Sequence, residues 1–197
     1  MKAADIMAFK PCVKRTERGF SLIECMISMA ILTIGLLSLL GVFGLAMAST
    51  QTSQENNTAK QLANEAMEGI LTARETANIT WAQINNTGSG GIFIGGFLPI
   101  NNPGADGIIG TADDAVAGAQ TLEMPGPTGT FVGTCPPDTC LPLTNFQRQI
   151  QIQPVFPVGG GPAYTTLRSV TITIQYTTPQ NKIPRQYILN SYISTFR

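Results

Sequence analysis

The most prominent hydrophobic pattern in the chain is a run of 23 residues, Met26 to Ala48, without a charged residue, Pro, Asn or Gln. A helix rises about 1.5 Å per residue, so this run would extend about 34 Å, more than the roughly 30 Å of a bilayer's hydrocarbon core. A chain of 197 residues offers little material to bury such a helix on all sides. The run therefore predicts a membrane-spanning helix.

After a polar stretch at residues 49–57, apolar residues recur at alternating steps of three and one. This spacing has a period near 3.6 and is typical of a helix that packs on one side. Charged residues such as Lys60 and Glu68 fall outside the stripe. Because the polar stretch has neither Gly nor Pro, we expect one helix from about Phe20 to about Ala77. The stripe consists of Ala59, Leu62, Ala63, Ala66, Met67, Ile70 and Leu71.

Beyond Trp81 the helical spacing gives way to alternation of apolar and polar residues. Residues 149–153 and 169–176 alternate strictly, which indicates antiparallel strands with one wet face. Residues 92–94 and 185–196 are expected to form a short strand and the last strand. The helix stripe would cover the apolar face of this sheet and give an α+β fold. The expected core is Leu62, Met67, Ile70, Leu71, Val170, Ile172 and Ile174.

Composition excludes several classes of function. The chain has no His, which removes the Ser-His-Asp triad, the Cys-His dyad and His-ligated zinc sites. Twelve basic and twelve acidic residues cancel, so the chain lacks the positive surplus that nucleic-acid wrapping requires. It also lacks a GxxxxGKS phosphate loop and evident paired carboxylates, and an enzyme is the least favoured class.

Basic residues gather on one side of the apolar run. Lys10, Lys14, Arg15 and Arg18 precede it, whereas the next basic residue downstream is Lys60. The positive-inside rule then predicts a single-pass protein whose N-terminus stays in the cytoplasm while the bulk of the chain is exported.

A small residue, Gly19, stands before the apolar run, whereas a secretory signal places its cleavage site after it. A cut between Gly19 and Phe20 would remove the basic leader and keep the apolar helix. Glu24 would then lie in the first turns of that helix, where an ionised carboxylate is costly without a partner. The natural partner is an amine, and a neighbouring subunit could supply the new one at Phe20.

The string GFSLIE at residues 19–24, followed by the apolar run, resembles the prepilin cleavage and methylation segment of type IV pilins and type II secretion pseudopilins. The resemblance implies a pilin-like fold, removal of the leader after Gly19 by prepilin peptidase, and N-methylation of Phe20. It also implies that Glu24 aligns the subunit against a neighbour's terminal amine.

A second resemblance narrows the class. Residues 30–39 are similar to the ILxIGLL segment of minor pilins of the PilV kind, and no Pro occurs between Pro11 and Pro99, which favours the minor class. The chain is then expected to comprise a leader (1–19), a membrane or filament-core helix (20–48), an amphipathic helix (49–80) and an exported β-rich head (81–197).

These resemblances imply a structural protein of the bacterial inner membrane and the pilus, periplasm or cell surface. It would help to start and assemble a type IV pilus, near the tip of the filament. Its partners would be prepilin peptidase, other minor pilins, the major pilin, the assembly platform and membrane lipid, but not nucleic acid. A minor pseudopilin of a type II secretion system and a pilus-displayed adhesin remain alternatives.

Two cysteines, Cys135 and Cys140, flank a Pro-Pro turn. In an exported domain a disulfide is the first expectation, because zinc would need further ligands that the chain does not offer. Cys12 would leave with the leader, and Cys25 would act as a small hydrophobe in the apolar helix.

The segment that starts at Asn102 resembles a calcium loop in part. Oxygen-bearing side chains at Asn102, Asp106 and Asp113 take positions 1, 5 and 12, with Gly107 at position 6. Position 3 is Gly104, position 12 is not Glu, and no helices are expected to flank the loop. The segment therefore has two interpretations. One is a calcium site, calcium being the one cofactor that the sequence suggests. The other is a turn around Asp106 whose acidic side chains face water.

Overall fold

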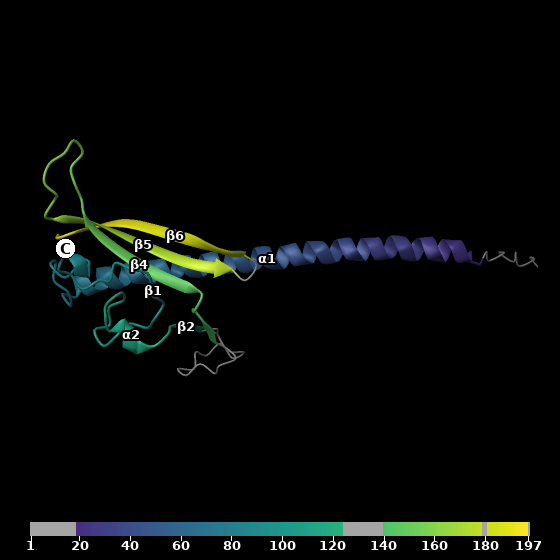
Figure 1. The fold of residues 1–197 in the computed structure, drawn as a ribbon, viewed down its shortest axis with the longest axis horizontal. Helices are drawn as coiled ribbons and strands as arrows, with labels where there is room; N and C mark the ends of the chain where they lie inside the picture. Colours follow the sequence, from purple (N-terminus) through teal and green to yellow (C-terminus); the bar gives the residue numbers. More distant parts are fainter. Residues whose placement is uncertain (1–18, 124–139, 179–180, 197) are drawn as a thin grey trace, which may run out of the picture. The chain divides into compact units, whose positions relative to one another are not determined.

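A computed structural model describes residues 19–123, 140–178 and 181–196. The chain divides into two units, Met1–Ala46 and Met47–Arg197. Helix α1, Leu22–Glu75, contributes to both (Figure 1). Its bounds confirm the long helix expected from about Phe20 to about Ala77.

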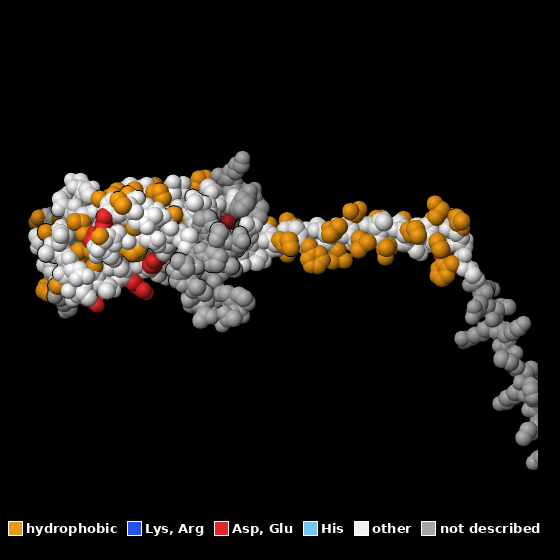
Figure 2. Space-filling model, turned by 90° about the horizontal axis from the view of Figure 1, so that it is seen from below, with side chains coloured by type: hydrophobic (Ala, Val, Ile, Leu, Met, Phe, Trp, Pro, Cys, Tyr) orange, Lys and Arg blue, Asp and Glu red, His pale blue; other side chains and the backbone are white. Residues whose placement is uncertain are grey.

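In the first unit, every residue of α1 from 22 to 46 is exposed. Figure 2 shows apolar side chains, in orange, along the face of the helix that is in view. By length and composition, the helix is long and apolar enough to cross a membrane, and its most apolar stretch is not buried. The hydroxyl groups of Ser28, Thr33 and Ser38 donate to carbonyls three or four residues earlier in the same helix. These hydroxyls are thus satisfied within the helix, as an apolar environment requires.

The second unit combines the rest of α1 with the head (81–197), which has two antiparallel sheets in its described part. The larger sheet has the order β1-β4-β5-β6, and β2 pairs with β3 in a separate ribbon. In chain order the elements after α1 are the 3-10 helix η1 Thr87–Ser89, β1 Leu98–Pro99, α2 Asp114–Ala117, β2 Thr121–Glu123, β3 Cys140–Pro142, β4 Phe146–Pro154, β5 Leu167–Thr178 and β6 Asn181–Ser194.

The core of the head lies between α1 and the larger sheet. In the sheet Ile150 pairs with Ile172, which in turn pairs with Leu189. The predicted core is confirmed, with Leu71 half-buried rather than fully buried, and so is the α+β fold of a long N-terminal helix packed on a C-terminal antiparallel sheet. The buried members of the predicted set are Leu62, Met67, Ile70, Val170, Ile172 and Ile174.

The structure corrects the strand expected at residues 92–94. Phe93 is fully buried but makes only an isolated bridge with Asn86, and the strand beside β4 is Leu98–Pro99 instead. The Asn86 side chain continues this edge, since its Oδ1 accepts from the Ile152 amide at 2.7 Å and its Nδ2 donates to the Ile150 carbonyl at 2.8 Å. One amide side chain thus satisfies backbone groups that a longer strand would otherwise pair.

The last strand also begins earlier than expected, at Asn181 rather than Arg185. Its pairing with β5 extends to Thr178, with a register irregularity after Tyr176.

Candidate processing and assembly site

The backbone around Gly19 and Phe20 is not helical. Gly19, Phe20 and Ser21 precede α1, all three are exposed, and Phe20 exposes 76% of its surface. The Ser21 carbonyl accepts the first helical hydrogen bonds, from the amides of Glu24 at 3.0 Å and Cys25 at 3.2 Å. The Gly19–Phe20 peptide bond therefore lies just outside the helix, where a protease can bind it without unwinding a turn.

Glu24 lies in the first turn of α1, where the positive end of the helix dipole favours a carboxylate. None of the described residues donates a hydrogen bond to this carboxylate. The three hydroxyl side chains that follow it in the first unit all bond to their own helix, and Cys25 is a free thiol. Within the described residues, the Glu24 carboxylate therefore has no hydrogen-bond donor, and a donor from another molecule would satisfy it.

The exposed Gly19–Phe20 bond, a first-turn carboxylate and an apolar helix form one continuous segment. Residues 14–40 match the prokaryotic N-terminal methylation motif. This methylation motif is of the prepilin cleavage type and suggests a type IV pilin or pseudopilin processed by prepilin peptidase. The match includes Gly19, Phe20 and Glu24. No curated protein and no solved structure matches the chain.

Together with the exposed apolar helix, the methylation motif is consistent with a pilin anchored in the inner membrane. Pilin-like proteins are structural rather than enzymatic. The motif covers the start of the chain, so the remaining predicted sites rest on the head's own geometry.

The head brings Asp106 and Asp113 together. The Asp106 amide donates to Asp113 Oδ2 at 3.1 Å, and Asp106 Oδ1 accepts from the Ile108 amide at 2.8 Å. The Thr111 hydroxyl donates to Asp113 Oδ1 at 2.6 Å and, with the Asp106 amide, lowers the pKa of Asp113. The carboxylates thus accept bonds from their own loop.

The turn expected around Asp106 is present, since the Gly107 amide donates to the Gly104 carbonyl at 3.1 Å. In the described ranges, no group of three or more His, Cys, Asp or Glu residues could hold a metal ion. Calcium binding by Asn102, Asp106 and Asp113 stays a prediction.

Sequence reasoning missed a buried pair of charged residues, Asp114 and Arg148, each 4% exposed. Asp114 accepts from the amides of Gly104 at 3.1 Å and Gly110 at 2.6 Å. Burial raises the pKa of Asp114, against these amides and the Arg148 charge, and burial lowers the pKa of Arg148, against Glu65 and Asp114. Asp114 belongs to the loop of residues 104–114 and Arg148 to β4, and the charge of Arg148 acts on Asp114 across this gap. Arg148 stands at an inward position between Phe146 and Ile150, and that alternation was the signal available.

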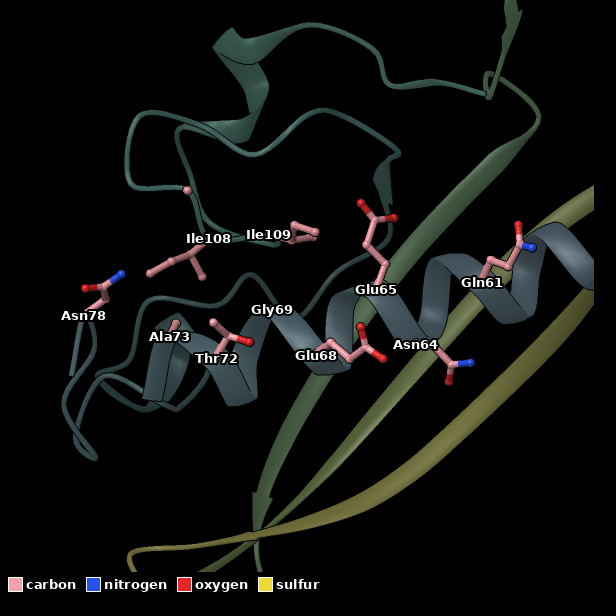
Figure 3. A pocket seen from close by; sticks show the side chains of 11 residues that line it. Gln61, Asn64, Glu65, Glu68, Gly69, Thr72, Ala73, Asn78, Ile108 and Ile109 are labelled. Atoms are coloured by element: carbon pink, nitrogen blue, oxygen red, sulfur yellow. The ribbon is translucent and has the colours of Figure 1, made fainter. Parts of the chain in front are cut away.

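A hollow of about 520 Å³ lies between α1 and the segment at residues 107–109, and both line it (Figure 3). Its titratable lining residues are Glu65 and Glu68, one turn apart on the same helix. The Glu65 oxygens accept hydrogen bonds from Gln120 Nε2 at 3.0 and 3.3 Å, so Glu65 already holds the residue that precedes β2.

The expected disulfide lies partly outside the described residues. Cys140 begins β3, whereas Cys135 falls in the stretch that the structure does not describe. The bond between them stays a prediction.

Proposed function

We propose that this chain is a structural minor pilin of a type IV pilus, cut after Gly19 by prepilin peptidase and methylated at Phe20. The observation that carries the proposal is the methylation motif on a helical segment, residues 22–46, that exposes its apolar side chains on every side and whose one carboxylate, Glu24, accepts no hydrogen bond from the described residues. Such a helix requires an apolar environment from outside the chain. Lipid provides it before assembly, and other subunits' helices provide it in a filament.

Glu24 sets the register between subunits in this proposal. Apolar contact between helices gains little in lipid, because the tails that it displaces are equally apolar. A carboxylate and a neighbour's Phe20 ammonium about 4 Å apart attract by roughly 4 kcal/mol at an effective dielectric near 20, before desolvation is subtracted. A shift by one helical turn, about 5.4 Å, would leave both charges unpaired.

The topology follows from charge. The basic leader, residues 1–19, stays in the cytoplasm, residues 20–48 span the inner membrane, and the amphipathic helix (49–80) and the head (81–197) are exported. The partners are then prepilin peptidase, the other minor pilins and the major pilin, the assembly platform and membrane lipid. The similarity of residues 30–39 to minor pilins of the PilV kind supports a role in filament initiation, near the tip.

The test replaces Glu24 by Gln, which keeps the side-chain shape and removes the charge. We expect Glu24→Gln to be inserted and cleaved as in the parent while the number of pili per cell and the recovery of partner minor pilins both fall. The matched control is Glu68→Gln, the same change at an exposed position in the second half of α1.

Parental values for Glu24→Gln in both assays would refute the registering role. Normal pili together with a defect in type II secretion would identify the chain as a pseudopilin instead.

A further inference from the structure

One face of the larger sheet packs against α1, and the opposite face, here called the outer face, carries a regular array of side chains. Its residues alternate along β4, β5 and β6 with the buried ones and align across the strands in four rows. The rows are Gln147–Gln175–Gln186, Gln149–Thr173–Ile188, Gln151–Thr171–Asn190 and Gln153–Ser169–Tyr192.

The outer face contains no charged residue. Seven of its twelve residues are Gln or Asn, three are Ser or Thr, and the others are Ile188 and Tyr192. Arg148, Arg168 and Arg185 occupy the alternate, inward register positions of the same strands, and Lys182 of β6 lies outside the four rows. Sheet surfaces are usually kept soluble by charged side chains, and here neutral amides take that place.

Neutrality continues beyond the row that holds Tyr192. No charged residue occurs between Gln153 and Arg168, in the loop that joins β4 to β5 (Figure 1). This loop exposes Phe156 and Tyr164, and the Tyr164 amide donates to the Val155 carbonyl at 2.8 Å to close its base. Exposed aromatic rings therefore lie beside the end of the amide array.

Each carboxamide offers two donors and an acceptor, and each hydroxyl offers both functions. Two of these groups already bond to the backbone, since Gln149 Nε2 donates to the Gly95 carbonyl and Ser169 Oγ to the Gln153 carbonyl. Thr173 is 8% exposed and contributes little to the surface. The other groups form a lattice with steps of about 4.8 Å between strands and about 6.8 Å along them. Tyr192, 67% exposed, adds an aromatic face at the edge strand β6.

We propose that the outer face binds a neutral polysaccharide. Sugar hydroxyl groups donate and accept hydrogen bonds as carboxamides do, and the C–H faces of sugar rings pack on aromatic rings such as Tyr192. An uncharged ligand fits because its binding removes no charged group from water, either on the outer face or on the ligand. This inference does not rest on the proposed assembly function.

Other occupants fit the outer face less well. Nucleic acids and acidic glycans would need basic side chains, and the four rows contain none. The cores of dimer interfaces are about 65% apolar. If a second copy of the chain docked here, it would bury mostly carboxamide groups, because Ile188 and Tyr192 are the two apolar residues of the four rows.

The test uses the full-length chain in polyoxyethylene detergent micelles, which carry no competing sugar headgroup. We expect retention on at least one of amylose, cellulose and dextran, and no comparable retention on alginate, an anionic polysaccharide. Tyr192→Ala, which removes the ring, and Asn190→Asp, which adds a charge and removes two donors, should each weaken binding by about tenfold or more. Asn64→Asp, the same change at an exposed position on α1, should leave binding within about twofold.

Melting curves establish that each variant is folded, and Gln186→Glu replaces Asn190→Asp if the latter melts early. Failure to bind all three neutral polysaccharides would overturn the proposal, as would equal retention on alginate. An equal loss in Asn64→Asp, or concentration-dependent dimerisation abolished by Tyr192→Ala, would also overturn it.

Discussion

The two halves of α1 form one continuous helix but differ in composition and in burial. In residues 22–46 every side chain is exposed, and Ile31, for example, exposes 66% of its surface. In the second half the stripe is buried, with Ala59, Ala63, Ala66 and Ile70 each 0% exposed. The first half is apolar around its whole circumference, whereas the second is apolar on one side.

The difference shows what each half requires. A striped helix is satisfied by one sheet, and the small Ala side chains let the backbone of α1 lie close to its partner. A helix that is apolar all round requires apolar surroundings on all sides, such as lipid or other helices. The stability of the head should therefore depend on the second half and be indifferent to the first.

The largest effect should come from a matched pair of truncations. Ile70→Ala leaves a cavity in the core and should lower the free energy of unfolding of the head by about 2–5 kcal/mol. Ile31→Ala, the same change in the exposed half, should leave it unchanged. Denaturation followed by the fluorescence of Trp81, whose indole donates to the Thr165 carbonyl, measures both. Equal losses would contradict the division of α1 into two halves.

A second pair enlarges small residues. Ala63→Leu forces extra volume between α1 and the sheet and should lower the free energy of unfolding by about 1–3 kcal/mol. Ala30→Leu should not change it, because Ala30 is exposed. If Ala63→Leu were tolerated as well as Ala30→Leu in the same denaturation assay, the close approach of helix and sheet would not matter for stability.

The smallest effect is electrostatic and belongs to the loop of the head. The Thr111 hydroxyl and the Asp106 amide lower the pKa of Asp113. At a pH between the usual carboxyl pKa and this lowered pKa, the unfolded chain therefore binds more protons than the folded one. The stabilisation is present above the usual carboxyl pKa and is lost as the pH falls through the lowered, folded value.

Asp113→Asn should therefore flatten the acid limb of a plot of unfolding free energy against pH, between about pH 2 and pH 5. Glu68→Gln, at an exposed position, is the control. An unchanged acid limb in Asp113→Asn would show that the hydrogen bonds of this carboxylate do not contribute to folding.

Elements with a local pattern could be predicted from the sequence. The stripe from Ala59 to Ile70 specifies its buried face by spacing alone, and alternation located β4 and β5. The methylation motif is equally local, because cleavage and methylation act on a short continuous segment.

Features that depend on tertiary partners could not be predicted. Nothing near Asn86 in the sequence indicates that its amide pairs with the edge of β4, more than 60 residues later. Asp114 resembles a solvated acid until the fold brings Arg148 beside it. The outer face is an intermediate case, since alternation predicts its polarity but the strand pairing is needed to align its rows.

The most direct test of the account is the mass of the mature protein isolated from membranes or filaments. Removal of 19 residues from the chain of 197 leaves 178, and the account predicts this chain with a methylated amine at Phe20. Gly19→Val, which places a bulky side chain at the cut, should instead yield the uncut chain. A mature protein that begins after Ala48, without the apolar half of α1, would contradict the account.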